Sequence, residues 1–171
     1  PVRPIMTGDA APRVSAWNLP RGNGWKRDTR DQWIEALVSA NPPPVDTTSV
    51  HLYHPRKGGD GYSGYGVEGQ SLADNLRTAM EAAAHSKRPL WLGEFGPGGG
   101  EKDTRERKRQ VAEFLDLIVE LRVPLSAYWV YDSPNPDLVV WSAGRTGSNS
   151  FVFDAIAAAN SRLQEAVAVE Q

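Results

Sequence analysis

Glu94 is the residue whose surroundings in the sequence most directly suggest chemistry. It stands in PLWLGEFGPGGG (residues 89–100), at the end of an apolar run and immediately before a glycine-rich stretch. If the apolar run is a strand, its rigid end aims one carboxylate into a site where the following loop begins. The simpler alternative is a strand-end carboxylate that contacts only water or a neighbouring backbone amide. The other residues of the chain must decide between the two.

Four short apolar segments have the composition of buried parallel strands. Each is dense in β-branched or aromatic residues and is bounded by Pro, Gly or Asp. They are VRPIMTG (2–8), TTSVHLYH (47–54), RPLWLGEFG (88–96) and PLSAYWVYD (124–132).

Helical patterns follow these segments along the chain. Thr29 begins the first, and Gln32 stands three residues later, which is the spacing of a capping box. Apolar residues at helical spacing predict four helices, at about 29–41, 71–86, 103–121 and 149–167. The alternation of strand and helix predicts an α/β fold with a parallel sheet.

Four such units are too few to close a barrel, because an eight-stranded (β/α) barrel typically needs about 250 residues. The chain has 171 residues and the composition of one globular domain. We therefore expect a single domain over residues 1–171 with the architecture of a (β/α)4 half of a TIM barrel. The same order of strands and helices also fits three narrower architectures. These are a small open sheet, a piece of a longer barrel, and a half-barrel that pairs with another chain.

The polar and aromatic residues that could do chemistry gather at one end of the predicted strands. Parallel sheets and barrels keep their sites at the carboxyl ends of the strands. The opposite connections are short or plain, and this asymmetry favours a functional interpretation of Glu94. The residues at the carboxyl ends are Asp9, His51, Tyr53, His54, Glu94, Trp129, Tyr131 and Asp132.

Composition excludes several classes of partner. The formal charge is −2, from 19 basic and 21 acidic residues, and there is no long run of either sign, so we expect neither nucleic acid nor a membrane surface as a partner. No apolar run approaches the roughly 18 residues of a membrane span. The absence of cysteine excludes disulfides and thiolate zinc sites but fits a secreted protein and a cytoplasmic one equally well.

No cofactor is expected. GYGVEG (64–69) has the residue pattern of the dinucleotide-binding fingerprint. It lies some distance beyond its predicted strand and lacks the acidic residue at the end of a second strand, so we do not interpret it as a nucleotide site. GPGGGEKD (96–103) fails as a phosphate loop, because its lysine is misplaced and Asp103 stands where Ser or Thr is required.

Taken in order, SVHLYHP, PLWLGEFG and SAYWVYD resemble strands six, seven and eight of the cellulase-like retaining glycoside hydrolases with a (β/α)8 barrel, and FDAIAAANSRL resembles their last helix. The resemblance implies that Glu94 is the catalytic nucleophile. It implies that His51 and Tyr53 form the family's His-x-Tyr pair in the substrate site, and that Trp129 is the floor beneath the sugar. The expected activity is hydrolysis of O-glycosidic bonds in oligo- or polysaccharides, so the expected substrate is a carbohydrate.

A retaining glycosidase also requires a protonated carboxyl group about 5 to 5.5 Å from the nucleophile. The family carries this acid/base in an Asn-Glu pair at the end of strand four, and the chain contains no such pair. The resemblance therefore implies that the acid/base half of the site would lie before Pro1, in a longer catalytic domain of which this chain is a fragment.

Other interpretations of the same residues stay open. Each of His51, Tyr53 and Trp129 could be a structural residue with its polar tip satisfied. The chain could be a non-catalytic carbohydrate-binding or structural half-barrel. A metal-dependent hydrolase using His51 and His54 is disfavoured, because residues three apart on a strand point to opposite faces. Because a half-barrel has two unpaired edges, we also expect a homodimer or association with a missing N-terminal half-barrel.

Overall fold

The computed structural model describes residues 3–54, 66–67, 69–98, 103–135, 138–139 and 141–168. Its elements confirm an α/β architecture. In chain order they are η1 (Leu19–Arg21), α1 (Arg30–Ala40), β1 (Thr48–Tyr53), α2 (Leu72–Ser86), β2 (Leu90–Gly96), α3 (Thr104–Glu120), β3 (Leu125–Tyr128) and α4 (Phe151–Ala168).

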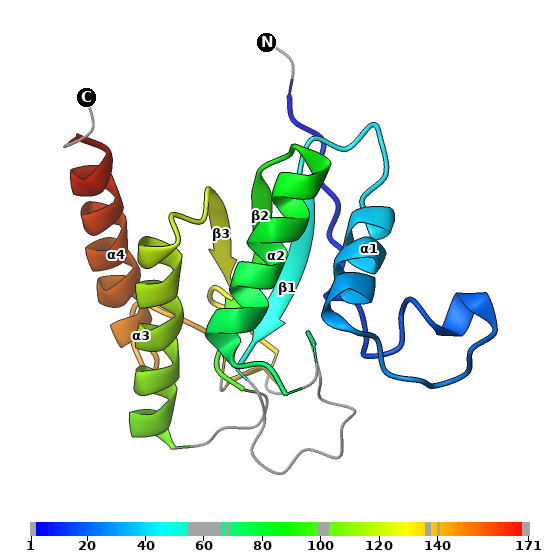
Figure 1. Cartoon of the computed structure of the whole chain (residues 1–171). Helices are drawn as coiled ribbons and strands as arrows, with labels where there is room; N and C mark the ends of the chain where they lie inside the picture. The colour runs from blue at the N-terminus through cyan, green and yellow to red at the C-terminus, as the bar shows by residue number, and fades with distance from the viewer. Residues whose placement is uncertain are drawn as a thin grey trace.

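The described strands form one parallel sheet in the order β1-β2-β3. Figure 1 shows α2 and α3 lying over one face of this sheet, with α1 beside α2 and α4 beside α3. The carboxyl ends of parallel strands meet at one edge, so the loops after β1, β2 and β3 begin at the same end of the molecule. Half of each glycine-rich segment, at 64–69 and 96–103, lies outside the described residues.

The helix boundaries follow the caps that the sequence contains. The capping box of α1 is formed: Gln32 N donates to Thr29 Oγ1 over 3.3 Å, and Thr29 N donates to Gln32 Oε1 over 2.9 Å. The side chain of Ser71 accepts from Asp74 N at the start of α2, and that of Asp103 accepts from an amide at the start of α3. The predicted positions of all four helices are confirmed to within a few residues.

The hydrophobic core lies between the sheet and its helices. Burial of large apolar side chains is the main favourable term in folding, at roughly 25 cal/mol per Å² removed from water. The largest fully buried apolar side chains are Trp33, Leu37, Val50, Leu52, Leu76, Leu90, Leu92, Phe95, Val111, Phe114 and Val152. Within the described part of the chain, no helix is both long and apolar enough to cross a membrane.

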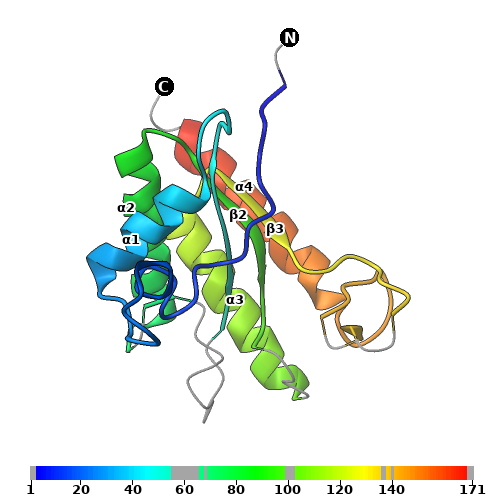
Figure 2. The ribbon, with the colours of Figure 1, turned by 90° about the vertical axis from the view of Figure 1, so that its right-hand side faces the viewer.

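The prediction of a strand at residues 2–8 is wrong for the part that the structure describes. Residues 3–8 have no strand pairing, and the segment instead runs past the β1 edge of the sheet (Figures 1 and 2). It is attached near the start of β1, where Ile5 N donates to Asp46 Oδ2 over 2.7 Å and Asp46 N donates to Ile5 O over 2.8 Å. The described sheet therefore has three strands rather than four.

The side chain of Asn41 explains why the segment need not pair as a strand. Asn41 is 1% exposed, and its amide binds both backbone groups of Ser49 in β1: Oδ1 accepts from Ser49 N over 2.9 Å and Nδ2 donates to Ser49 O over 3.3 Å. The same amide donates to Leu37 O and accepts from Thr7 Oγ1. The Asn41 side chain thus satisfies the backbone N–H and C=O of Ser49, which a neighbouring strand would otherwise bind.

We predict that Asn41→Ala lowers the free energy of unfolding by on the order of 3 kcal/mol, because it leaves two buried backbone groups of Ser49 without partners. Thr7→Val is the matched control, since it removes one hydrogen bond to the same amide and should cost only about 1 kcal/mol. Equilibrium unfolding in urea, followed by circular dichroism, measures both. Equal losses for the two variants would contradict the role given to Asn41.

Candidate active site

Three of the four site residues predicted from the sequence meet at one carboxylate oxygen. Tyr53 donates its phenolic hydrogen to Glu94 Oε2 over 2.5 Å, and His51 Nδ1 lies 3.2 Å from the same oxygen. The side chains of His51 and Glu94 are 13% and 23% exposed, so they are shielded but still reachable from solvent. Glu94 is therefore not a strand-end carboxylate that contacts only water.

A β-bulge in β2 directs Glu94 toward this cluster. Val50 pairs with Leu92, and His51 pairs with Glu94, so Gly93 is an extra residue in the ladder. Side chains alternate between the two faces of a strand, and an inserted residue reverses that alternation. Leu92 is buried in the core, and without the bulge Glu94 would follow it there.

Phe95 takes the core position that Glu94 vacates. It is 2% exposed, and its ring centroid lies 5.5 Å from that of Phe114 on α3. On β1, Leu52 is buried in the same core, so His51 and Tyr53 on either side of it point to the opposite face. The three polar side chains consequently share the face of the sheet that turns away from α3.

Gly93 leaves the space that the His51 imidazole occupies. A Cβ added at Gly93 would lie 2.9 Å from His51 Nε2 and 3.1 Å from Trp91 Nε1. Contacts under 3.0 Å are not tolerated without movement. Gly93 is therefore the extra residue of the bulge, and its lack of a side chain leaves room for the His51 imidazole beside Glu94.

The arrangement orients the carboxylate for chemistry at one oxygen. The Tyr53 hydroxyl and the His51 ring both meet Oε2, whereas Oε1 makes no hydrogen bond within the described residues. An ionised carboxylate can only accept hydrogen bonds, and the Tyr53 hydroxyl donates one of them to Oε2. A carboxylate held at one oxygen, with its other oxygen not engaged by any described residue, is suited to nucleophilic attack on an electrophilic carbon.

Trp129 lies immediately after β3, the strand that pairs with the Glu94 strand β2. Its backbone N–H donates to Phe95 O over 2.9 Å, and its carbonyl oxygen would lie 3.3 Å from a Cβ added at Gly96. Trp129 is half-buried as a residue, and the peptide bond to Val130 is cis. The main chain thus brings Trp129 to the same end of the sheet as the Tyr53–Glu94 pair.

The other residues singled out from the sequence lie elsewhere. His54 points to the helix side of the sheet and contacts Glu113 on α3, so it does not join His51. Asp9 is half-buried in the N-terminal segment, and Asp132 is exposed beyond β3. Tyr131 is exposed and packs its ring edge-on against Phe153. Within the described residues, no group of three His, Asp or Glu side chains could hold a metal ion.

One ionisable group behind the site has a shifted pKa. Burial raises the pKa of Tyr128 to about 12, against the smaller opposing effect of Arg107. Its ring meets Phe95 edge-on, with centroids 5.7 Å apart. Tyr128 therefore stays neutral at physiological pH and acts as an aromatic packing residue on β3.

Two features of the site escaped the sequence-based prediction. The bulge has a visible signal, because an isolated glycine inside a strand pattern often marks one, and Gly93 stands in the middle of RPLWLGEFG. The contact between His54 and Glu113 has no local signal, because it joins residues 59 positions apart.

No protein-family model matches the chain, and no curated protein matches it at a significant level.

We predict that Gly93→Ala displaces the His51 imidazole, because the new methyl group would meet Nε2 at 2.9 Å. The ¹⁵N resonances of His51 should shift, and the His51–Glu94 contact should lengthen. Gly8→Ala is the matched control, since nothing lies within 4 Å of a Cβ at Gly8. Unchanged His51 resonances in Gly93→Ala would show that the ring does not occupy this space.

Proposed function

We propose that this chain carries the nucleophile half of a cellulase-like retaining glycoside hydrolase site, and that its three described strands and four helices belong to one half of a TIM barrel. In this proposal Glu94 attacks the anomeric carbon, and His51 and Tyr53 orient it and bind the sugar. Trp129 provides an aromatic surface for the apolar face of the sugar ring.

The convergence of the Tyr53 hydroxyl and the His51 imidazole on Glu94 Oε2 is the observation that carries the proposal. It is the arrangement that a glycosidase nucleophile requires, because the carboxylate must be ionised and must present one oxygen to the substrate. A merely structural carboxylate would not require a bulge that brings it out of the core. The ordered resemblance of the three strand segments supports the same assignment.

The second carboxyl group of a retaining site is not assigned to any residue of this chain. An acid is needed to protonate a poor leaving group, such as a sugar hydroxyl. Dinitrophenolate is a stable anion and leaves without protonation. Attack by Glu94 on a dinitrophenyl glycoside forms the bond between the carboxylate oxygen and the anomeric carbon, while the bond to the phenolate oxygen breaks and its electron pair leaves with the phenolate.

This difference allows a test on the chain as it stands. Dinitrophenyl 2-deoxy-2-fluoroglycosides of several sugars should label Glu94 covalently, and peptide mass spectrometry should locate the glycosyl group there. Glu94→Gln should lower the rate of dinitrophenolate release by about a thousand-fold or more, because the amide is a poor nucleophile. Glu120→Gln, on an exposed helix position, is the control and should react as the wild type does.

Labelling of a different residue, or equal rates for Glu94→Gln and the wild type, would overturn the assignment. If the wild type binds oligosaccharides in calorimetry but none of the fluoroglycosides labels it, the alternative of a non-catalytic carbohydrate-binding half-barrel takes its place.

We also propose that a second copy of the chain covers the β3 edge of the sheet and the exposed N-terminal segment beside β1. Leu125 on the edge strand β3 is 44% exposed, and Ile5 and Met6 beside the other edge are 52% and 44% exposed. Exposed apolar side chains at an unpaired strand edge favour association. A two-fold axis would bring the β3 edge of each copy against the N-terminal segment of the other, and both seams would be equivalent.

Light scattering coupled to size exclusion should show a dimer at micromolar concentration, and Leu125→Glu should convert it to a monomer by placing a charge in each seam. Leu19→Glu is the matched control, because Leu19 is also exposed but lies in η1, away from β3. A folded wild-type monomer would refute self-association.

A further inference from the structure

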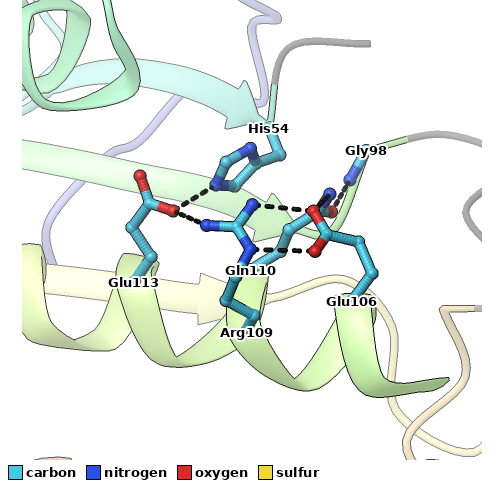
Figure 3. Close-up of polar contacts among 6 residues, drawn as sticks. All are labelled: His54, Gly98, Glu106, Arg109, Gln110 and Glu113. Atoms are coloured by element: carbon cyan, nitrogen blue, oxygen red, sulfur yellow. Dashed lines mark hydrogen bonds and ion pairs between the residues drawn. The ribbon is translucent and has the colours of Figure 1, made fainter. Parts of the chain in front are cut away.

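A network of polar side chains lies on the helix side of the same strand ends that carry the candidate site (Figure 3). We refer to it as the α3 clamp. It comprises His54 after β1, Gly98 after β2, and Glu106, Arg109, Gln110 and Glu113 on α3.

The α3 clamp holds each strand end by one direct hydrogen bond. His54 Nε2 lies 2.9 Å from Glu113 Oε2, and Gly98 N donates to Gln110 Oε1 over 2.8 Å. Because a carboxylate only accepts hydrogen bonds, His54 Nε2 is the protonated ring nitrogen in this contact. The ends of β1 and β2 are thus both fixed to the same helix.

The helix side chains of the clamp are bonded to one another. Arg109 donates to Glu113 over 2.8 Å and to both oxygens of Glu106 over 2.7 and 2.9 Å. Gln110 Nε2 donates to Glu106 Oε1 over 3.0 Å. Positions 106, 110 and 113 lie on one face of a helix, and this explains how they reach a common set of partners.

The two strand ends are also packed against each other and against the helix. The His54 side chain is 11% exposed, and its ring meets Phe114 edge-on with centroids 6.1 Å apart. A Cβ added at Gly98 would lie 3.0 Å from His54 O, so a side chain here would require Gly98 or the end of β1 to move by a few tenths of an ångström. Movement of His54 would therefore disturb both strand ends.

We propose that His54 is a positioning residue for Glu94, acting through the α3 clamp and through Tyr53. Tyr53 precedes His54 directly, and neighbouring side chains on a strand point to opposite faces. Fixing His54 to α3 fixes the backbone from which Tyr53 reaches Glu94, and fixing Gly98 limits the movement of β2 just beyond Glu94. The role of His54 in catalysis rests on the proposed function, whereas its effect on the Tyr53–Glu94 contact does not.

Three single variants test the proposal. His54→Leu removes the hydrogen-bond donor but keeps an apolar side chain against Phe114. His54→Gln retains a donor near the position of Nε2 and should rescue the contact. His85→Leu is the matched control, because His85 also lies near a glutamate, Glu81, but is an exposed residue on α2 at the far end of the sheet.

The first measurement is the ¹³Cζ resonance of Tyr53 in tyrosine-labelled protein, assigned by its loss in Tyr53→Phe. His54→Leu should shift this resonance away from its wild-type position, whereas His54→Gln and His85→Leu should leave it in place. An unshifted Tyr53 resonance in folded His54→Leu overturns the proposal. If His54→Leu does not fold, Gln110→Met, which cuts the bond to Gly98, must produce the shift, and an unshifted resonance there overturns it as well.

The second measurement is the covalent labelling of Glu94 by a dinitrophenyl fluoroglycoside. His54→Leu should lower the maximal labelling rate by about 10-fold to 100-fold with little change in the concentration for half-maximal rate, because a misplaced nucleophile affects reaction more than binding. An unchanged maximal rate in His54→Leu contradicts the catalytic role of His54. Absence of labelling in the wild type would instead count against the proposed function, and the Tyr53 resonance would still decide whether His54 positions the pair.

Discussion

The bulge at Gly93 is the constraint on which the candidate site depends. Strand alternation alone would send Glu94 into the core behind Leu92, where an ionised carboxylate could not remain without a partner. The extra residue reverses the alternation, so that Phe95 enters the core and Glu94 reaches the face that bears His51 and Tyr53. Gly93 thereby allows the end of β2 to place an apolar side chain in the core and a carboxylate on the opposite face.

The same bulge links packing energy to the geometry of the site. Phe95 lies against Phe114 on one side and Tyr128 on the other, so the end of β2 is held by aromatic contacts from α3 and β3. Aromatic pairs of this kind contribute about 0.5 to 1.5 kcal/mol each beyond the burial of their area. Any shift of β2 that moved Glu94 away from Tyr53 would also disturb these contacts, so the fold resists distortion of the site.

Much of the architecture was predictable because local signals agreed with the tertiary structure. Thr29 and Gln32 mark a helix start by their own hydrogen bonds, and dense apolar runs mark β1 and β2. The segment at residues 2–8 has a similar composition, but Asn41 already occupies the strand groups of Ser49 that such a neighbour would use. Composition shows that a segment can form a strand. It does not show whether the backbone groups of the neighbouring strand are already hydrogen-bonded to a side chain from another part of the chain.

That His51, Tyr53 and Glu94 lie near one another was predictable from the sequence, but their geometry was not. Order along the chain placed His51, Tyr53 and Glu94 at one end of the sheet, but only the register shows that they share a face. The contact between His54 and Glu113 depends on how α3 crosses the strand ends, which no local pattern encodes. Tyr53 and His54 are consecutive, and their side chains point to opposite faces of the sheet. Tyr53 contacts Glu94 on one face and His54 contacts Glu113 on the other, so both contacts constrain the same stretch of backbone. The helix side of the sheet is therefore part of what determines the position of Glu94, although none of its described side chains has a hydrogen bond or ion pair to the carboxylate.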